Sequence, residues 1–480
     1  MNHSTKIGSL QRLLLASLAL WLFPHFGQAQ PQNKRPNILL ILADDWSFPH
    51  AGIYGDLTVK TPNFDRVASS GVLFSEAYVA APSCTPSRAG ILTGRYVHGL
   101  EEGANLWGSL NKSFVTYTAL LEQAGYAVAY QEKGWAPGDH TQGGYTHNPA
   151  GHRVDHFKPF FENLPENQPF CFWYGSRDPH RPYTEGMGKR AGMNISDITV
   201  PAFLPDDDIV KSDLADYYYE VQRFDYDIGS ILEVLQRKKL LDNTLIVITS
   251  DNGMPFPRSK ANCYDSGTKV PLAMAMGSDL HSAGKTEHSF INLIDLAPTF
   301  LELAGLDIPA SYQGKSLLPL IKNTAFERRE EIYLERERHA YVRNHNLAYP
   351  MRAIRNHSFL LIENLFPDRY PAGAPLTDGN RFGDIDASPT KDLLLNMEPS
   401  RKIYQWAVGK RPKYELYHIS DDPDQVNNLA DLPAYKKTVK AMAKQLLHWR
   451  EKTKDPTLHK GEHLFDTYPY YGKKMNPLLN

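Results

Sequence analysis

Three continuous apolar runs of strand length constrain the fold of this chain more than any other feature. They are Asn37–Ala43, Phe170–Tyr174 and Leu245–Thr249. A strand that is apolar at every position is typical of a strand covered on both faces. Amphipathic stretches with helical spacing lie between the runs, of which Thr61–Ser70 and Ser212–Lys239 are the clearest. This alternation predicts an α/β fold with a mostly parallel central sheet between helices.

The character of the chain changes beyond about residue 350. We expect a large catalytic domain over 30–350 and a smaller C-terminal domain over 351–480, made of a short antiparallel sheet and one helix. The segments that indicate this are two strands at 353–355 and 358–363, a loop-rich stretch at 366–389, a strand at 414–417 and a helix over about 434–452.

The first 29 residues have the organisation of a cleaved signal peptide. Lys6 and Arg12 precede the apolar run Leu13–Phe23, and Gly27–Ala29 supplies the small residues of a cleavage site near Ala29. A membrane anchor is the alternative, but the run is too short for a bilayer of about 30 Å. The mature protein is expected to be periplasmic or secreted, with a lysosomal location as the alternative, and free of the membrane after cleavage.

Charge and cysteine content narrow the function. The chain has 52 Lys and Arg against 54 Asp and Glu, a net charge of -2, so a nucleic-acid partner is not expected. In an exported protein the three cysteines cannot all pair with one another. Cys171 lies in an apolar strand and is expected in the core, whereas Cys263 follows a Pro-rich loop and receives no assignment. Cys84 stands at the start of a predicted helix.

Two of the predicted strands end in acidic clusters. Asp44 and Asp45 follow the first apolar run, and Asp251 and Asn252 follow the third. Ligands bind at the carboxyl ends of strands in open α/β sheets. Such an oxygen set suits Ca²⁺ or Mg²⁺, and the absence of clustered His and Cys argues against zinc. Taken singly, each cluster is an ordinary helix cap or turn.

The segment Cys84–Gly94 adds a reactive side chain to an anion site. Its sequence is Cys-Thr-Pro-Ser-Arg-Ala-Gly-Ile-Leu-Thr-Gly, with Pro86 in the first turn of a helix. The free N–H groups and the dipole at that end favour an anion, and Arg88 adds a cation. The alternative is a proline-started helix with an incidental cysteine.

This segment resembles the type I, formylglycine-dependent sulfatases, whose signature C-x-P-S-R-x-x-x-L-T-G it matches throughout. The resemblance runs from Arg35 to Ala430. It implies an alkaline-phosphatase-like large domain and one Ca²⁺ ion. It also implies that a formylglycine-generating or anaerobic sulfatase-maturating enzyme converts Cys84 to formylglycine. The implied substrate is a sulfated carbohydrate.

The resemblance also implies the site residues. The expected metal ligands are Asp44, Asp45, Cys84, Asp251 and Asn252, and the expected catalytic residues are Cys84, Arg88, Lys133, His180 and Lys260. One hydroxyl of the hydrated aldehyde would attack sulfur while His180 or Lys260 protonates the leaving atom. Deprotonation of the other hydroxyl would then expel sulfate.

The chain departs from the family at one position of the pocket. Many members carry K-x-H, whereas here Lys133 is followed by Gly134 and Trp135. The base for the elimination step is therefore open. His98 and His140 are candidates by proximity in sequence, and the alternative is that both are solvated surface imidazoles.

Within the family the chain is most similar to the heparan N-sulfatase (sulfamidase) branch. The segments that indicate this are Asp178–Arg181, Ser250–Pro257 and Tyr349–Ala353. Lys260 stands where that branch has arginine. An O-sulfatase for another polysaccharide, such as an algal glycan, is therefore an alternative. Less favoured alternatives are a phosphodiesterase or phosphonate hydrolase of the same fold and a sugar-binding protein on an inactive scaffold.

Two clusters are candidates for sugar recognition. The arginines of Glu335–His339 and Arg343 could bind a carboxylate or a second sulfate, or they could lie on a solvated face with local ion pairs. Trp107 and Asn105 could contact a sugar ring, or Trp107 could simply pack. The residues expected at the sugar are His98, Asn105, Trp107, Trp135, Arg336, Arg338, His339 and Arg343.

Overall fold

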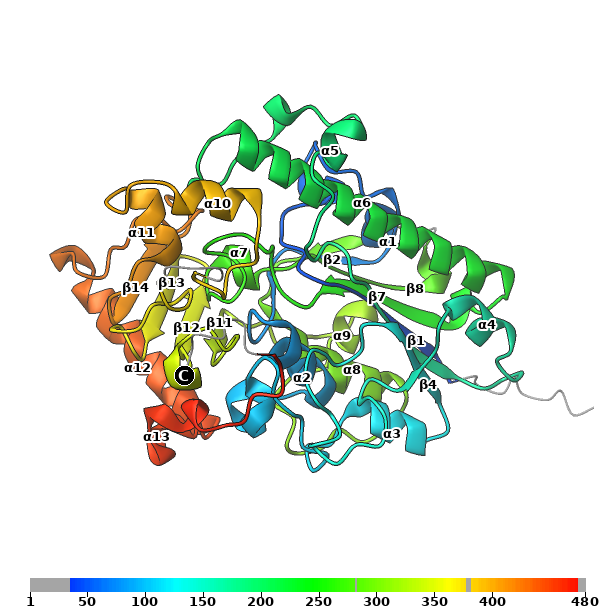
Figure 1. Ribbon diagram of the computed structural model, residues 1–480. Coiled ribbons are helices and arrows are strands. Elements are labelled where there is room, and N and C mark those ends of the chain that lie inside the picture. Colours follow the sequence, from blue (N-terminus) through cyan, green and yellow to red (C-terminus); the bar gives the residue numbers. More distant parts are fainter. Residues whose placement is uncertain (1–34, 281–282, 377–380, 474–480) are drawn as a thin grey trace, which may run out of the picture. The chain divides into compact units, whose positions relative to one another are not determined.

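An eight-stranded sheet with the order β5-β4-β6-β1-β7-β8-β2-β9 is the centre of the fold (Figure 1). The first five strands in this order, β5, β4, β6, β1 and β7, pair in parallel. The next strand, β8, is antiparallel to both of its neighbours, β7 and β2. The predicted mostly parallel sheet is therefore confirmed. The strands are β1 (Asn37–Ala43), β2 (Val72–Phe74), β4 (Ala127–Glu132), β5 (His152–Arg153), β6 (Phe170–Gly175), β7 (Thr244–Ser250), β8 (Leu272–Met276) and β9 (Lys285–Glu287).

The computed structural model describes residues 35–280, 283–376 and 381–473. The expected signal peptide at 1–29 lies outside these residues. None of the helices in the described part of the chain is long and apolar enough to cross a membrane.

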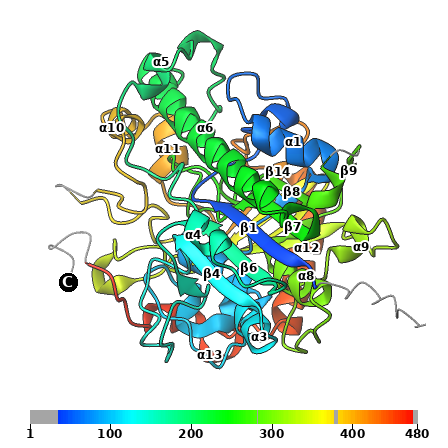
Figure 2. The same cartoon turned by 90° about the vertical axis from the view of Figure 1, so that its right-hand side faces the viewer.

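Both faces of the sheet are covered by helices, as the apolar runs predict (Figures 1 and 2). Along β1, Ile38 and Leu40 pack into the core that includes α2, α3 and α8. Leu39 and Ile41 pack into the opposite core, which includes α1 and α6. The helices of these two layers are α1 (Pro62–Ser70), α2 (Cys84–Thr93), α3 (Tyr117–Gln123), α6 (Asp208–Arg237) and α8 (Leu296–Leu303).

A smaller antiparallel sheet of four strands follows, with the order β11-β12-β13-β14. Ile354 on one face packs against Leu446 and Trp449 of α12 (Lys436–Lys452). Met351 on the other face belongs to a cluster with Tyr78 and Cys263, so Cys263 is a core residue between this sheet and the rest of the fold. The strands are β11 (Glu331–Arg336), β12 (Met351–Asn356), β13 (Phe359–Asn364) and β14 (Tyr414–His418).

The small sheet contains strands from both sides of the predicted boundary at residue 350, because β11 ends before that boundary and pairs with β12 after it. By contacts, Arg35–Asn480 forms one compact unit. The division into domains at 30–350 and 351–480 therefore stays a prediction.

The stretch expected to be rich in loops, 366–389, leads into two short helices. Ala372, Phe382 and Ile385 pack with side chains of these helices in a separate apolar cluster. The remaining elements are β3 (Ala77–Tyr78), β10 (Ile291–Asn292), α4 (Phe157–Glu162), α5 (Met187–Arg190), α7 (Asp265–Thr268), α9 (Leu318–Ile321), α10 (Pro389–Leu395), α11 (Lys402–Val408) and α13 (Thr457–Lys460).

Candidate active site

The two acidic strand ends meet because β1 and β7 pair in parallel, with Ala43 opposite Ser250. Asp44 and Asp45 follow Ala43, Asp251 follows Ser250, and the backbone N–H of Asp45 donates to Asp251 Oδ1 at 3.1 Å. The side chain of Asn252 donates to Asp45 Oδ1 at 2.6 Å. The predicted oxygen cluster is thus present at the carboxyl edge of the sheet.

Cys84 is the first residue of α2 and lies against this cluster. Its thiol donates to Asp44 Oδ1 at 3.4 Å, and its side chain is 2% exposed. One ligand atom each of Asp44, Asp45, Cys84 and Asp251 lies within 4.8 Å of the other three. Burial raises the pKa of the Cys84 thiol well above its usual value, although Lys133 and Lys260 oppose the effect. The unmodified thiol is therefore protonated at neutral pH and a poor nucleophile.

The chemistry of this cluster fits a bound calcium ion. Asp44, Asp45 and Asp251 are fully buried carboxylates crowded at one point, and burial raises the pKa of Asp251. The amide oxygen of Asn252 is buried without a hydrogen-bond partner. Since Ca²⁺ takes carboxylate and amide oxygens, it would relieve both the like-charge repulsion and the unpaired acceptor.

Three cations surround the carboxylates, as the sequence predicts. Lys133 Nζ lies 2.6 Å from Asp44 Oδ2, and Lys260 Nζ lies 2.7 Å from Asp45 Oδ2. Arg88 Nε donates to Asp251 Oδ2 at 2.8 Å. Burial alone would lower the pKa of each cation, but the carboxylates raise all three. The pocket therefore holds fixed positive charge beside Cys84, which suits an anionic group.

His180 presents one free ring nitrogen to the same site. Its Nδ1 lies 2.5 Å from the Arg181 carbonyl oxygen, which can only accept, so Nδ1 carries the proton. Its Nε2 lies 3.8 Å from Asp45 Oδ2, and the side chain is 33% exposed. The imidazole is thus within reach of both the cluster and a ligand from solvent.

Asp386 belongs to the site and was missed at the sequence level. Its carboxylate lies 3.6 Å from Lys260 Nζ, and it groups with Asp45 and His180 within 4.8 Å. Burial alone would raise the pKa of Asp386, but Lys260 and His180 lower it, so the group stays anionic. The Asp384-Ile385-Asp386 sequence lies in a loop with no motif, so only the fold reveals its place.

His339 reaches the start of α2 from the segment after β11. Its Nδ1 lies 2.8 Å from Oγ of Ser83, the residue before Cys84, and burial lowers its pKa to about 3. The imidazole is therefore neutral and 5% exposed. His339 is one of the residues expected to contact the sugar, and it lies directly beside the segment Cys84–Gly94.

His98 does not reach the cluster around Cys84 with a free nitrogen. Its Nδ1 is paired with Glu335 Oε2 at 2.5 Å, and its Nε2 faces the Thr453 carbonyl oxygen at 3.4 Å. The side chain is buried, so the alternative of a surface imidazole is wrong for His98. The other candidate base, His140, is half-buried on the loop after Trp135, where its carbonyl accepts from Gly143.

Trp135 is a core residue. It is 1% exposed and packs in the layer that includes α2. Its backbone N–H donates to Asn148 Oδ1, and its carbonyl accepts from Asn148 Nδ2, both at 2.9 Å. At the position where many family members have histidine, this chain therefore has a tryptophan that packs in the core.

Replacing Trp135 with histidine is expected to destabilise the protein and to give no gain in turnover. Loss of a buried indole costs about 3 kcal/mol, and the imidazole adds a polar group to an apolar site. Urea unfolding measures the change. The control Trp107→His is expected to cost less, because Trp107 is only half-buried. Unchanged stability with faster turnover would show that position 135 opens into the active site.

The arginine run is buried, so the alternative of a solvated face is wrong. Arg336 and Arg343 both pair with Asp384 Oδ2, at 2.6 and 2.8 Å. Arg338 donates to the carbonyl oxygens of Tyr468 and Pro469. Each guanidinium group is buried and has a protein partner, although Arg336 Nε and Nη1 and Arg343 Nη1 have no hydrogen-bond partner among the described residues, and a direct contact with sugar stays a prediction.

The second candidate cluster is divided between core and surface. Asn105 is fully buried and accepts from the Arg338 backbone N–H at 3.0 Å. Trp107 is half-buried beside Tyr470, with ring centroids 6.4 Å apart. Of the two, Trp107 alone keeps exposed surface for a ligand.

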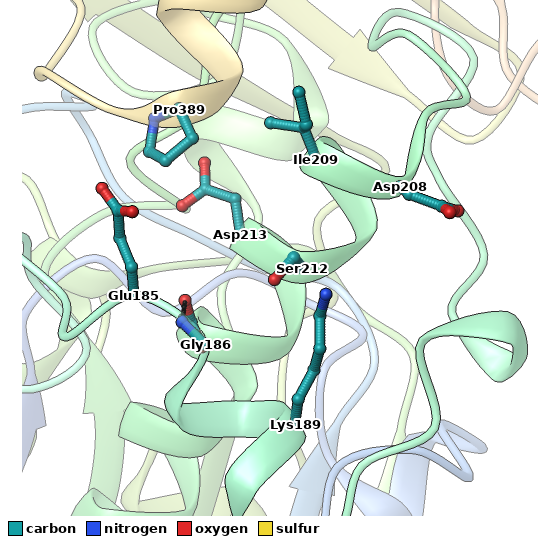
Figure 3. A pocket seen from close by; sticks show the side chains of 9 residues that line it. Glu185, Gly186, Lys189, Asp208, Ile209, Ser212, Asp213 and Pro389 are labelled. Carbon is teal, nitrogen blue, oxygen red and sulfur yellow. Dashed lines mark hydrogen bonds between the residues drawn. The ribbon is translucent and has the colours of Figure 1, made fainter.

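An open cavity of about 390 Å³ lies between α6 and the start of α10 (Figure 3). Its lining includes Ser212, Asp213 and Pro389. Asp213 forms two hydrogen bonds to Arg181, at 2.7 and 2.8 Å, and accepts from Thr390. Arg181, which Asp213 holds, is the residue that follows His180.

Comparison with known proteins identifies the family. A family model described as Sulfatase matches residues 36–306, and one described as N-sulphoglucosamine sulphohydrolase, C-terminal, matches residues 259–369. The first match covers more than half of the chain, so the chain belongs to the sulfatase family and is an enzyme of that class. The resemblance inferred from Cys84–Gly94 is confirmed.

Individual relatives align over most of the chain. Human N-sulphoglucosamine sulphohydrolase is 29% identical, over 92% of this chain and 94% of that protein. An ulvan-active sulfatase of Formosa agariphila is 26% identical, over 87% of this chain and 75% of that protein. A solved structure of a protein with its substrate D-glucosamine-2-N,6-O-disulfate superposes with a TM-score of 0.62 and 22% identity, over 88% and 99% of the two chains. This structural similarity, at 22% identity, supports the assignment of the fold alone.

Proposed function

We propose that the chain is a formylglycine- and calcium-dependent hydrolase that releases sulfate from a sulfated carbohydrate. The observation that carries the proposal is the position of Cys84, between three buried carboxylates and the cations Arg88, Lys133 and Lys260. A maturation enzyme of the formylglycine-generating or anaerobic type would be its partner. The protein would act in the periplasm or outside the cell after removal of residues 1–29.

Asp44, Asp45, Asp251 and Asn252 would hold the calcium ion, next to residue 84. When bound, the ion supplies positive charge that attracts sulfuryl oxygens and lowers the pKa of a nearby hydroxyl. The hydrated formylglycine at position 84 supplies the nucleophilic oxygen. Arg88 is placed to orient that side chain, because its guanidinium is fixed by Asp251 and by the carbonyl oxygens of Lys133 and Gly134.

The chain's own groups supply the charge and the proton that cleavage needs. Lys133 and Lys260 would neutralise the sulfuryl oxygens. As the imidazolium, His180 would protonate the leaving nitrogen or oxygen from Nε2, because its Nδ1–H is donated to the Arg181 carbonyl oxygen and Nε2 faces the pocket. Over one full turnover a single water is consumed: its oxygen leaves in sulfate, one of its protons goes to the sugar and the other is released to solvent. His140 remains the histidine candidate for the second deprotonation.

The best candidate substrate is an N-sulfoglucosamine or heparan-type fragment. Support comes from the human N-sulphoglucosamine sulphohydrolase and from the C-terminal family match over 259–369. An O-sulfatase acting on an algal glycan is the second candidate, favoured by the similarity to ulvan-active sulfatases. Lys260 stands where the N-sulfatase branch has arginine, and this difference in the pocket is a further reason for the second candidate.

Sulfate release by the matured enzyme tests this choice. The panel is N-sulfated, 6-O-sulfated and 3-O-sulfated glucosamine together with ulvan oligosaccharides, read by ion chromatography. Fastest release from the N-sulfated sugar supports the first candidate. Release from ulvan alone supports the second, and no release from any sulfated sugar contradicts the proposal.

Asp386→Asn is expected to lower kcat/KM for a sulfated sugar about 10- to 100-fold. The anionic carboxylate lies beside His180 and Lys260, where the leaving sugar would sit, and it would accept hydrogen bonds from sugar hydroxyl groups. An aryl sulfate offers no such hydroxyl, so its turnover should change much less. Initial rates on both substrates measure the difference.

The matched control is Asp392→Asn, an exposed carboxylate in the first turn of α10. It should leave both substrates unaffected. An equal loss on sugar and aryl sulfate would instead mean that Asp386 acts through Lys260 and does not contact the sugar.

A further inference from the structure

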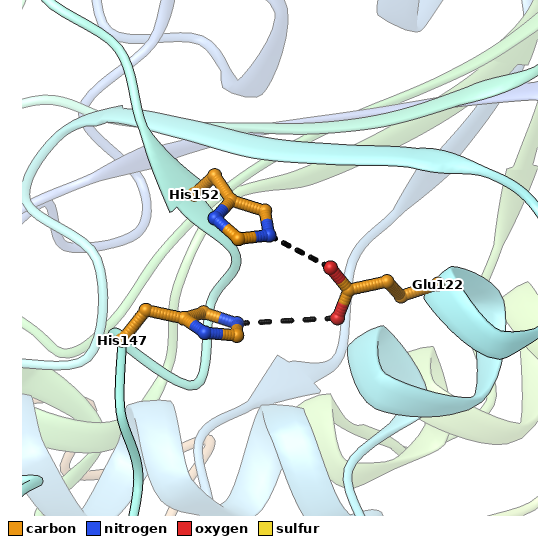
Figure 4. A group of neighbouring side chains, drawn as sticks. All are labelled: Glu122, His147 and His152. Carbon is orange, nitrogen blue, oxygen red and sulfur yellow. Dashed lines mark hydrogen bonds and ion pairs between the residues drawn. The ribbon is translucent and has the colours of Figure 1, made fainter.

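A second group of metal-ligating side chains lies on elements outside the Cys84 site (Figure 4). Glu122 is in the last turn of α3, His147 is on the loop between β4 and β5, and His152 opens the edge strand β5. Nε2 of His152 lies 2.8 Å from Glu122 Oε1, and Nε2 of His147 lies 3.9 Å from Glu122 Oε2. One ligand atom from each residue lies within 4.8 Å of the other two.

The two imidazoles stack on each other beside Glu122. Their rings stack with centroids 4.3 Å apart and an interplanar angle of 20°. Burial lowers the pKa of His147, and the neighbouring His152 lowers it further. Two rings in this contact would repel each other if both were charged, and the lowered pKa of His147 favours the neutral imidazole that binds a metal.

Two neutral imidazoles and a carboxylate form a donor set for Zn²⁺ and similar ions, unlike the oxygen set around Asp251. The side chains of His147, Glu122 and His152 are 38%, 41% and 60% exposed, so water could complete the coordination. Zn–N bonds are about 2.0–2.1 Å long, so the three side chains must close on the ion. Exposed side chains can rotate with little loss of packing.

We propose that Glu122, His147 and His152 bind one divalent transition-metal ion of the Zn²⁺ type. The site shares no ligand with the calcium site and does not include Cys84. It would tie the loop that carries His147 to helix α3 and to the edge strand β5. At present Thr118 of α3 donates to the Pro149 carbonyl oxygen of this loop, β5 pairs with β4 at two positions, and a cavity of about 100 Å³ remains beside Glu122 and His147.

The loop that the metal would fix reaches the active site through Asn148. Both polar atoms of the Asn148 side chain hold the backbone of Trp135. The preceding residue, Gly134, accepts a hydrogen bond from Arg88, and a Cβ at Gly134 would lie 2.7 Å from Asn148 Oδ1. Ordering His147 therefore restricts the segment that positions the Arg88 guanidinium.

Zinc titration by calorimetry tests the proposal, on the full-length protein with calcium in excess to occupy the oxygen site. The expected result is one Zn²⁺ per chain with a dissociation constant below about 100 µM. The double variant His147→Ala/His152→Ala should weaken this binding at least tenfold, and Glu122→Gln should weaken it less. His156→Ala, an exposed histidine outside the cluster, should bind as the unaltered protein does.

Hydrogen exchange supplies a readout independent of turnover. Zinc should slow exchange of the backbone amides in 141–151 in the unaltered protein and leave them unchanged in the double variant. Binding no tighter than about 1 mM, or equal binding by the double variant with a matching melting temperature, would overturn the proposal.

Discussion

Cys84→Ala is expected to abolish sulfate release while leaving the fold intact. The rate should drop by roughly 10⁴-fold or more, the scale seen when an enzyme loses its nucleophile. The stability cost should be small because alanine is a good helix former and the thiol makes only a 3.4 Å contact with Asp44. Sulfate release and thermal unfolding, measured on the same preparation, check both halves of the expectation.

The matched control is Cys171→Ala. Cys171 is 1% exposed in the sheet core and touches none of the carboxylates of the site. Its loss should lower stability modestly through a small cavity and leave turnover nearly unchanged. Near-normal activity of Cys84→Ala would refute the nucleophile assignment.

Asp251→Asn is expected to lose calcium and activity together. The substitution keeps the size of the side chain but removes one of three buried negative charges that would face the ion. Calcium affinity should decrease more than about 100-fold, beyond the 10- to 100-fold typical of outer-shell partners. Calorimetric calcium titration and sulfate release measure the two losses, and a calcium chelator should reproduce the loss of activity in the unaltered enzyme.

Asp251→Ala should lose metal and activity as well, with an added stability cost because buried Arg88 loses the carboxylate that accepts from its Nε. The control for both variants is Asp225→Asn. Asp225 is also buried, but it accepts from the backbone N–H groups of Asn63 and Phe64 at the start of α1. Its variant should be less stable yet still bind calcium. Full calcium affinity in Asp251→Asn would contradict the metal assignment.

The sequence predicted those parts of the site that depend on neighbouring strands. Asn37–Ala43 was predicted with its observed bounds, and the third run extends by one residue at each end to Thr244–Ser250. Because parallel pairing aligns the carboxyl ends of these strands, the meeting of Asp44 and Asp45 with Asp251 followed from topology. The helix at Cys84 followed from Pro86 and ends where Gly94 adopts a left-handed φ of 62°.

Contacts between distant segments could not be predicted in this way. Arg336 looks solvated in a run of alternating charges, yet its partner Asp384 lies 48 residues further along the chain. His98 is paired with Glu335, 237 residues away. Asp386 has no sequence signal at all, because its role depends on how the loop before α10 approaches Lys260. A single sequence does not specify which loops meet.

The most direct test of the account is mass spectrometry of the tryptic peptide 67–88, which contains Cys84. The enzyme is produced with its maturation machinery and is first shown to release sulfate. The account predicts the mass decrease that replaces CH₂SH by CHO at residue 84, and loss of that signal on aldehyde-specific labelling. An unmodified cysteine in this peptide of a fully active preparation would contradict it.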